Sequence, residues 1–501
     1  MKLKELIYSL DCPTEGMEDI EVTGVVCNSK EVSAGNLFAA IGGGKKDVLP
    51  FIKEAAEKGA SVVVTEKAAA GTACPQVVVK DARSALARIS DRFFNKPTKK
   101  LKTVGVTGTN GKTTVTYLIE SVFREAGLVC GVIGTVNYRY GAKLLPAPWT
   151  TPDAPALQKL LRDMVDSGVT HCVMEVSSHA IDQLRVEGVR FGVKIFTNLT
   201  AEHLDYHHTM EEYFEAKAKF FTSPSFDPGR AVAIINIDDK WGAELKKNTR
   251  ASLGYSLGRN ADIWPTDYSV TEDGISAAIY TPRGTVTVRS PLVGEHNLYN
   301  ILASVGAGCV LGFDLDIIGR GVSELKSVPG RLERIGVSPT AYVDYAHTPD
   351  ALEKTLSVLT GSSKGRIITV FGCGGNRDRT KRPLMGAISA RFSHMTILTS
   401  DNPRDEDPLE IIKEIEKGLG GVKKYQAAGV SALDRGYMVI PDRLEAIRKA
   451  VEIAGKADTV LVAGKGHEDY QIVKGARFPF DDREALKGFL KGAAKEEVFQ
   501  R

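Results

Sequence analysis

The stretch GTNGKTT occupies residues 108–114, between the strand pattern LKTVGVT at residues 101–107 and a helical pattern that begins near Val115. A strand, a glycine-rich loop and a helix in this order form an anion site, because the loop N–H groups and the helix N-terminus face the same anion. Apolar residues recur at helical spacing after the loop and predict one buried helix face: Val115, Leu118, Ile119, Val122 and Phe123. The stretch therefore predicts an α/β domain built around a phosphate-binding loop.

The loop differs in one place from the generic phosphate loop. That pattern has a glycine five residues before Gly111, where this sequence has Val106, so a shorter variant is implied. We expect Lys112 to contact the β- and γ-phosphates of a nucleotide and Thr113 to offer its hydroxyl to Mg²⁺. The whole loop is taken as the nucleotide contact: Gly108, Thr109, Asn110, Gly111, Lys112, Thr113 and Thr114. A helix-capping glycine turn without a ligand is the alternative.

A phosphate loop alone does not separate an enzyme from a nucleotide-dependent switch. A GTPase-like binding module therefore stays open as a different class of protein. Such a module normally reads guanine with an Asn-Lys-x-Asp run after the loop, whereas the Asn95-Lys96 pair of this chain precedes it and is followed by Pro-Thr. A comparison of ATP and GTP affinity would separate the two classes.

Length and composition restrict the class further. A chain of 501 residues favours about three domains. The net charge is only +3, and the sequence has no long basic run, so nucleic acid and anionic membranes are not expected partners. The beginning of the chain lacks the apolar core of a signal peptide, and no later stretch approaches the roughly 20 apolar residues of a membrane span. We expect a cytoplasmic, monomeric protein with small-molecule substrates.

The domain organisation follows from the strand patterns. Strand-like runs and helical stretches before the linker NKPTKK (residues 95–100) predict an N-terminal α/β domain at residues 1–98. The runs HCVMEV, VKIFTN and AVAIINI alternate with helical patterns, which predicts a central phosphate-loop domain with a mostly parallel sheet at residues 99–330. After SVPGRLERIG, further strand patterns predict a doubly wound, Rossmann-like C-terminal domain at residues 331–501.

Seven motifs in the predicted central and C-terminal domains resemble the Mur ligase family, and the resemblance as a whole covers all three predicted domains. They are GTNGKTT, MEVSSH (174–179), HLDYH (203–207), EAKAKFF (215–221), GEHNLYN (294–300), PGRLE (329–333) and VDYAHTPDAL (343–352). The resemblance implies a three-domain, ATP-dependent ligase that extends a UDP-linked muramoyl peptide by one amino acid through an acyl phosphate. The N-terminal domain would bind UDP, the central domain ATP and the C-terminal domain the amino acid.

Two further motifs, DNPR (401–404) and GKGHE (464–468), are similar to the branch of the family that adds meso-diaminopimelate to UDP-N-acetylmuramoyl-L-alanyl-D-glutamate in peptidoglycan precursor synthesis. A sibling that adds L-lysine is the nearest alternative. Siblings that add alanine, D-glutamate or a D-alanyl dipeptide follow. Folylpolyglutamate synthase shares the ATP-binding core, but the predicted UDP-binding domain argues against it.

The resemblance also implies a magnesium site and a catalytic set. Glu175 ends the buried strand pattern CVMEV, where an oxygen ligand for Mg²⁺ is well placed beside the phosphate loop. The family pattern adds His203 as a ligand of a second Mg²⁺ and Lys217 as a lysine that carries a carbamate. The implied metal ligands are Thr113, Glu175, His203 and carbamylated Lys217, and the implied catalytic residues are Lys112, Lys217, His203, Glu175 and Arg331. A lysine on a solvated helix surface is the alternative for Lys217 and for Lys219 nearby.

The remaining nucleotide contacts come from the same resemblance. It implies Asn297 beside the adenine, Asp344 on the ribose and Arg331 on the γ-phosphate. Arg331 and Asp344 lie beyond the second predicted domain boundary. An arginine from another domain stabilises the transferring phosphoryl group only when the cleft closes, so we expect domain motion to gate the reaction.

The other substrates are assigned in the same way. For UDP, the resemblance implies Ser29, Gly44, Lys45 and Lys46, although Asn28, Lys30 and Val48 depart from the usual family pattern. For the dipeptide end it implies Thr150, Thr151, Ser177, Gln183 and Arg185. For the amino acid it implies Arg377, Asp401, Asn402, Pro403, Arg404, Gly464 and Glu468. The planar guanidinium of Arg404 suits a carboxylate, and the carboxylate of Glu468 suits an ammonium group.

Overall fold

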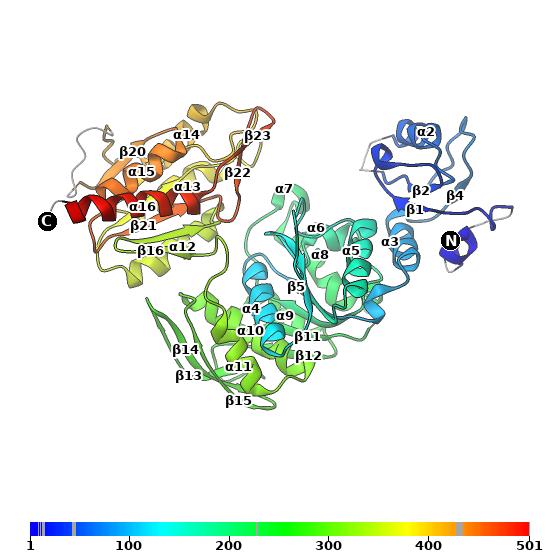
Figure 1. Ribbon diagram of the computed structural model, residues 1–501, viewed down its shortest axis with the longest axis horizontal. Coiled ribbons are helices and arrows are strands. Elements are labelled where there is room, and N and C mark those ends of the chain that lie inside the picture. Colours follow the sequence, from blue (N-terminus) through cyan, green and yellow to red (C-terminus); the bar gives the residue numbers. More distant parts are fainter. Residues whose placement is uncertain are drawn as a thin grey trace.

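The computed structural model describes residues 1–499, apart from residues 9, 11, 13–15, 43–46, 227–228 and 427–433. The chain forms three α/β units, and the N-terminal and C-terminal units lie at opposite ends of the central one (Figure 1). The proposed UDP residues Gly44, Lys45 and Lys46 lie outside the described residues.

The N-terminal unit is built on a four-stranded parallel sheet with strand order β1-β2-β3-β4. Alternate strand residues face opposite sides: Leu37 and Val62 pack with α1 and α3, whereas Phe38 and Val63 pack with α2. The elements are α1 (Leu3–Ile7), β1 (Gly24–Val26), β2 (Asn36–Ala39), α2 (Leu49–Glu57), β3 (Val62–Thr65), β4 (Gln76–Val78) and α3 (Ala82–Phe93).

The central unit contains an eight-stranded sheet with order β12-β11-β10-β5-β9-β6-β7-β8. Six neighbouring strands are parallel, and the β7–β8 hairpin adds an antiparallel edge: β5 (Lys102–Thr107), β6 (Cys130–Ile133), β7 (Tyr138–Tyr140), β8 (Lys143–Leu145), β9 (His171–Glu175), β10 (Phe191–Phe196), β11 (Val232–Asn236) and β12 (Ser252–Tyr255). The mostly parallel sheet predicted from sequence is confirmed.

Helices cover both faces of this sheet. One face packs mainly against α4 and α10, and the other against α5 and α8. The helices are α4 (Lys112–Glu125), α5 (Ala154–Asp166), α6 (Ser178–Asp182), α7 (Leu204–His207), α8 (Met210–Thr222), α9 (Lys240–Lys247), α10 (Glu295–Leu311) and α11 (Leu315–Glu324). The helix after the phosphate loop begins at Lys112, earlier than predicted, because residues 112–114 already have helical geometry.

A three-stranded antiparallel sheet was not predicted. It consists of β13 (Trp264–Thr271), β14 (Gly274–Thr281) and β15 (Gly284–Ser290) and packs against α10 and α11. In β14, Ile275, Ala277 and Ile279 are buried, and the period of two identifies a strand with one face on the core. The sheet thus extends the core that holds α10 behind the phosphate loop.

The C-terminal unit has a six-stranded sheet with order β16-β17-β21-β18-β19-β20, antiparallel only at β16. Helices α12 to α14 cover one face, and α15 and α16 the other, which confirms the predicted doubly wound fold. The elements are β16 (Glu333–Val337), β17 (Thr340–Asp344), α12 (Pro349–Ser362), β18 (Ile367–Phe371), α13 (Lys381–Phe392), β19 (Met395–Leu398), α14 (Pro408–Glu416), β20 (Gly436–Val439), α15 (Arg443–Ile453), β21 (Thr459–Ala463), β22 (Tyr470–Val473), β23 (Ala476–Pro479) and α16 (Asp482–Phe499).

The connections between the units contain the predicted domain limits. A short 3-10 turn, Pro97–Lys99, separates α3 from β5, and the segment after α11 leads to β16. The predicted domain limits, 98/99 and 330/331, fall within these connections. Their exact positions stay predictions. Across the described part of the chain, no helix is both long enough and apolar enough to cross a membrane.

A buried ion pair holds α15 and α16 together behind the carboxyl end of β21. Arg443 donates from Nε and Nη2 to the two carboxylate oxygens of Asp482, both at 2.7 Å, and from Nη2 to the carbonyl of Ala463 at 2.9 Å. Both charged side chains are completely buried.

We expect Arg443→Met to lower the free energy of unfolding of the C-terminal domain by about 3–5 kcal/mol, because Asp482 would be left buried and unpaired. Urea unfolding measures this loss. The control is Arg448→Met, which breaks only an exposed pair with Glu445 on the same helix. Equal losses for the two variants would contradict the structural importance of the buried pair.

Candidate active site

The phosphate loop connects the end of β5 to the first turn of α4. Gly111 has φ 88°, and a Cβ atom there would lie 2.4 Å from Asn300 Oδ1. At Gly108, with φ 146°, a Cβ atom would lie 1.9 Å from Thr197 Oγ1. Both positions therefore require glycine, for conformation and for space.

Two lysines meet at one carbonyl of this loop. Lys112 Nζ donates to the carbonyls of Gly108 at 2.9 Å and Thr109 at 2.7 Å, and Lys217 Nζ donates to the same Gly108 carbonyl at 3.0 Å. Burial lowers the pKa of Lys112. The pKa of Lys217 is held well below its ordinary value by burial and then by the charge of Lys112. Lys217 is therefore a buried side chain at the phosphate loop and not a lysine on a solvated helix surface.

Glu175 lies at the end of β9, beside the loop, with 1% of its surface exposed. Its Oε1 accepts hydrogen bonds from Thr113 Oγ1 at 3.0 Å and from the Thr135 N–H at 2.9 Å, and its Oε2 accepts from Thr135 Oγ1 at 2.9 Å. A carboxylate and a hydroxyl at the phosphate loop are the hard oxygen donors that Mg²⁺ prefers. Thr113 and Glu175, predicted from sequence as ligands, therefore fit a magnesium ion.

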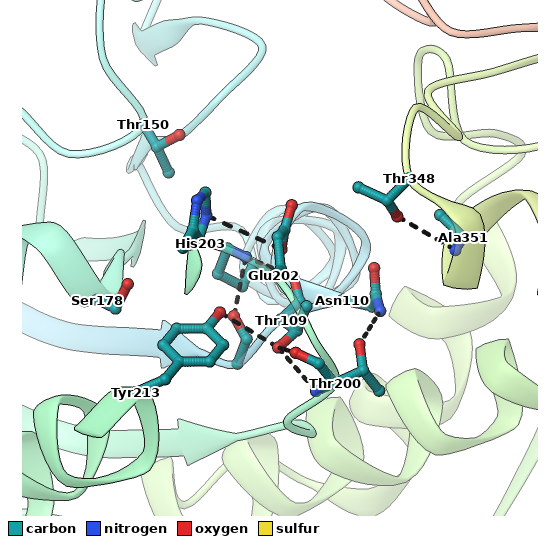
Figure 2. A network of polar contacts seen from close by, with 12 residues as sticks. Thr109, Asn110, Thr150, Ser178, Thr200, Glu202, His203, Tyr213, Thr348 and Ala351 are labelled. Atoms are coloured by element: carbon teal, nitrogen blue, oxygen red, sulfur yellow. Dashed lines mark hydrogen bonds and ion pairs between the residues drawn. The ribbon is translucent and has the colours of Figure 1, made fainter. Parts of the chain in front are cut away.

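A histidine and acid cluster lies on the other side of the loop. The His203 ring is 4.9 Å from the His179 ring, and its Nε2 is 3.9 Å from Glu202 Oε2 (Figure 2). Burial raises the pKa of Glu202, but the nearby cationic groups, His203, Lys112, His347 and Lys217, together keep the pKa below its usual value. Glu202 and His179 were missed by the sequence analysis, although His179 ends the quoted motif MEVSSH.

The structure does not bring the predicted metal ligands into one ready-made cluster. Among the residues it describes, no three His, Cys, Asp or Glu side chains are grouped as a metal site. His203 contacts His179 and Glu202, whereas Glu175 is bonded to Thr113 and Thr135. The roles of His203 and Lys217 as ligands stay predictions, because additional oxygen atoms, such as those of phosphate or a carbamate, would have to complete the sites.

The C-terminal unit contacts the phosphate loop directly. Asp350 Oδ2 accepts hydrogen bonds from Asn110 Nδ2 and Thr200 Oγ1, each at 3.1 Å. Arg331 Nη2 donates to Thr113 Oγ1 at 3.3 Å, and its buried Nε has no partner within the described structure. Arg331 therefore lies beside the phosphate loop, and its contact with the γ-phosphate stays a prediction. Asp350 and Thr200 had no role in the sequence analysis.

The two other predicted nucleotide residues, Asn297 and Asp344, form hydrogen bonds with nearby segments of the protein. Asn297 Nδ2 donates to the Val293 carbonyl at 2.8 Å. Asp344 accepts from the N–H groups of Leu332 at 2.6 Å and Ala346 at 2.9 Å, and burial raises the pKa of its carboxyl group. Asp344 thus braces the segment that follows Arg331. Contacts of Asn297 with adenine and of Asp344 with ribose stay predictions.

The predicted dipeptide residues form one hydrogen-bonded group beside Glu175. Thr150 Oγ1 lies 3.1 Å from Thr135 Oγ1, and Thr151 Oγ1 donates to the Glu175 carbonyl at 2.9 Å. Arg185 Nη1 donates to the Thr151 carbonyl at 2.9 Å. The group is completed by Gln183, which accepts from Arg185 Nη2 at 2.6 Å, and by Ser177, which caps α6.

Ser29 is less accessible than its predicted role requires. It is buried, and its hydroxyl donates to Glu54 Oε2 at 2.6 Å. A contact between Ser29 and UDP stays a prediction.

The predicted amino-acid residues meet at the carboxyl ends of β18, β19 and β21, the edge where doubly wound sheets bind ligands. Asn402 Nδ2 donates to Glu468 Oε2 at 2.8 Å, and Arg404 Nη1 donates to the Gly375 carbonyl at 2.8 Å. Asp401 Oδ1 is buried and has no hydrogen-bond partner in the described structure. Pro403 and Gly464 belong to the same two loops, while Arg377 is exposed beside them. We name this set, with Lys465, the amino-acid pocket.

The C-terminal unit thus contacts the phosphate loop of the central unit and has a cluster of charged side chains at the carboxyl edge of its own sheet. Three family models match the chain: Mur ligase family, catalytic domain (residues 21–94), Mur ligase middle domain (106–308) and Mur ligase, glutamate ligase domain (330–466).

Whole-chain comparisons agree with these matches. A UDP-N-acetylmuramoyl-L-alanyl-D-glutamate–2,6-diaminopimelate ligase from Geobacter sulfurreducens is 46% identical, over 99% of this chain and 100% of its own. A solved structure with the same ligase name is 33% identical, with 99% of both chains covered and a TM-score of 0.69. A MurF ligase from Thermotoga maritima, solved in complex with ADP, shares the fold at 19% identity, with 96% of this chain and 100% of that chain covered and a TM-score of 0.62. The chain belongs to the Mur ligase family.

Proposed function

We propose that this protein is the ATP-dependent ligase that joins meso-diaminopimelate to the D-glutamate side-chain carboxylate of UDP-N-acetylmuramoyl-L-alanyl-D-glutamate, in peptidoglycan precursor synthesis. The observation that carries the proposal is the amino-acid pocket, where Arg404 and two acids, Asp401 and Glu468, lie within two facing loops. The 46% identical relative bears the name of this ligase, which supports the same assignment.

The chemistry explains the phosphate loop. A carboxylate reacts with an amine only after one of its oxygens becomes a good leaving group. A carboxylate oxygen of the nucleotide-linked substrate attacks the γ-phosphorus of ATP, ADP leaves, and an acyl phosphate forms. The amine then attacks the acyl carbon, and inorganic phosphate and the amine proton are released as the amide forms.

Residues at the interface of two domains would support the first step. Lys112 and Arg331 supply positive charge beside the phosphate loop, where it stabilises a transferring phosphoryl group. Thr113 and Glu175 would hold Mg²⁺, which neutralises phosphate charge when bound. Arg331 and Asp350 belong to the C-terminal unit and contact Thr113 and Asn110, which supports the expectation that domain motion gates the reaction.

The proposed reaction also bears on where the protein acts. ATP and a UDP-linked intermediate are cytoplasmic metabolites, so we infer that the protein acts in the cytoplasm. A monomer stays the predicted state.

An L-lysine ligase is the second candidate, because lysine presents the same amine and differs by one distal carboxylate.

We expect the wild type to use meso-diaminopimelate at least about a hundredfold better than L-lysine, because lysine would leave the Arg404 guanidinium without a carboxylate partner. Arg404→Ala should lose most activity with diaminopimelate and narrow this ratio. ATP-dependent phosphate release, with the UDP-linked dipeptide and a panel of amino acids, measures both effects.

The control is Arg448→Ala, an exposed arginine on α15 that lies outside the amino-acid pocket. It should retain both the activity and the ratio. Equal use of lysine and diaminopimelate by the wild type would reject the diaminopimelate assignment. An unchanged ratio in Arg404→Ala would reject the role of Arg404.

A further inference from the structure

Lys465 is a buried cation within the amino-acid pocket. Its side chain is 0% exposed, and its Nζ donates to Asn402 Oδ1 and to Glu468 Oε2, each at 3.1 Å. The same Nζ lies 3.7 Å from Asp401 Oδ1. One ammonium group therefore touches three predicted substrate residues, which come from two loops more than sixty positions apart in the chain.

Lys465 and the Ile472 N–H together fix which way the Asn402 amide points. Asn402 Oδ1 accepts from Lys465 Nζ and from the Ile472 N–H at 2.9 Å, so the oxygen faces two donors. Its Nδ2 consequently faces Glu468 and donates to Oε2 at 2.8 Å. Both hydrogen bonds to Glu468 thus go to Oε2. Among the contacts of the described residues, Oε1 is the oxygen left open to a ligand.

Lys465 also balances the charge of the pocket. Asp401 and Glu468 are two acids near one another, and a low-dielectric site makes their mutual repulsion costly. The lysine offsets one of the two charges. It lies too far from Asp401 Oδ1 for a hydrogen bond, so that buried oxygen stays without a partner. The two acids and Lys465 together carry one net negative charge, which matches one ammonium group of a ligand.

We propose that Lys465 is a positioning residue that sets both the geometry and the charge of the amino-acid pocket. With Lys465 in place, the acids suit one ammonium group and Arg404 suits one carboxylate, so a zwitterionic distal end is preferred over an ammonium alone. Without it, the pocket gains one negative charge and favours the more cationic amino acid. This inference rests on the proposed ligase function.

The decisive variant is Lys465→Met, which keeps the length of the side chain and removes its charge. We expect the KM for meso-diaminopimelate to rise about tenfold to a hundredfold, since two charge-assisted hydrogen bonds are lost, while kcat and the KM for ATP change little. The preference for diaminopimelate over L-lysine should fall about tenfold. A loss of folding alone would not shift KM, kcat and amino-acid preference in this pattern.

Two further variants make the test specific. Lys465→Arg keeps the charge and should retain the amino-acid preference, even if the KM rises because the guanidinium is larger. Lys474→Met removes the same charge from an exposed site on the β22–β23 hairpin and should match the wild type. If Lys465→Met fails to fold, the preference measured for Lys465→Arg decides.

The inference is overturned if Lys465→Met keeps the wild-type KM and preference, or if Lys465→Arg loses the preference. A wild type that forms no amide with any amino acid would instead reject the proposed function. The two failures are therefore distinguishable in one set of assays.

Discussion

Replacing Lys217 with alanine is expected to lower amide formation about a hundredfold to a thousandfold. Lys217 Nζ is buried beside Lys112, and its pKa is held well below the ordinary value, which favours the neutral amine over the ammonium form. A neutral amine attacks CO₂: an N–C bond forms, the nitrogen loses a proton, and a carbamate results. Its oxygens would supply anionic ligands that an ammonium group cannot.

A short carboxylic acid such as acetate should partly restore the activity of Lys217→Ala, because it returns a carboxylate to the space left by the side chain. Carbon-13 NMR with labelled CO₂ should show a carbamate signal in the wild type and none in the variant. Lys219→Ala is the matched control, since this lysine is on the same helix but 56% exposed. Full activity of Lys217→Ala without any additive would refute the carbamate.

Lys112→Ala should reduce phosphate release about a hundredfold to a thousandfold when ATP, the UDP-linked dipeptide and the amino acid are all present. The Lys112 ammonium group is held at the loop by the carbonyls of Gly108 and Thr109, at the place where the β- and γ-phosphates are expected. Because these contacts are confined to the loop and its first helical turn, the variant should keep its fold, which thermal unfolding would check.

Lys102→Ala removes an exposed lysine from the opposite end of β5 and should release phosphate normally. Lys112→Arg should retain part of the activity, since the charge is kept but the geometry changes. Near-normal phosphate release by Lys112→Ala would show that residues 108–114 do not bind the reacting nucleotide as predicted.

Some features of the active site could be read directly from the chain, because they depend on short-range geometry. The strand, loop and helix around Gly108 and Lys112 follow one another within a few residues, and their periodicity predicts the phosphate loop. Glu175 could be placed for a similar reason, since a strand pattern ends there. Arg404 was assigned differently, through the resemblance of DNPR to a family motif, and the structure places this motif after β19.

Other residues were missed because their roles arise from long-range packing. Glu202 gains its position beside Lys112 and His203 only when β5 and β10 pair as neighbours in the sheet. Asp350 reaches Asn110 across 240 residues of chain. Asp350 lies within the motif VDYAHTPDAL and Glu202 directly precedes HLDYH, but neither motif shows what these acids contact. The three-stranded sheet β13–β15 was not predicted, because its buried face packs against α10 and α11, which lie later in the chain.

The sequence alone determined the three-domain α/β architecture, the phosphate loop and membership of the Mur ligase family, because periodicity, glycine placement and motif spacing are properties of neighbouring residues. Tertiary structure decided the environment of individual charges. Burial beside Lys112 holds the pKa of Lys217 well below its ordinary value, and the meeting of two loops places the buried Lys465 between Asn402 and Glu468. The charge state of a side chain depends on its removal from water and on the charged groups that distant segments bring beside it. A short stretch of sequence shows neither.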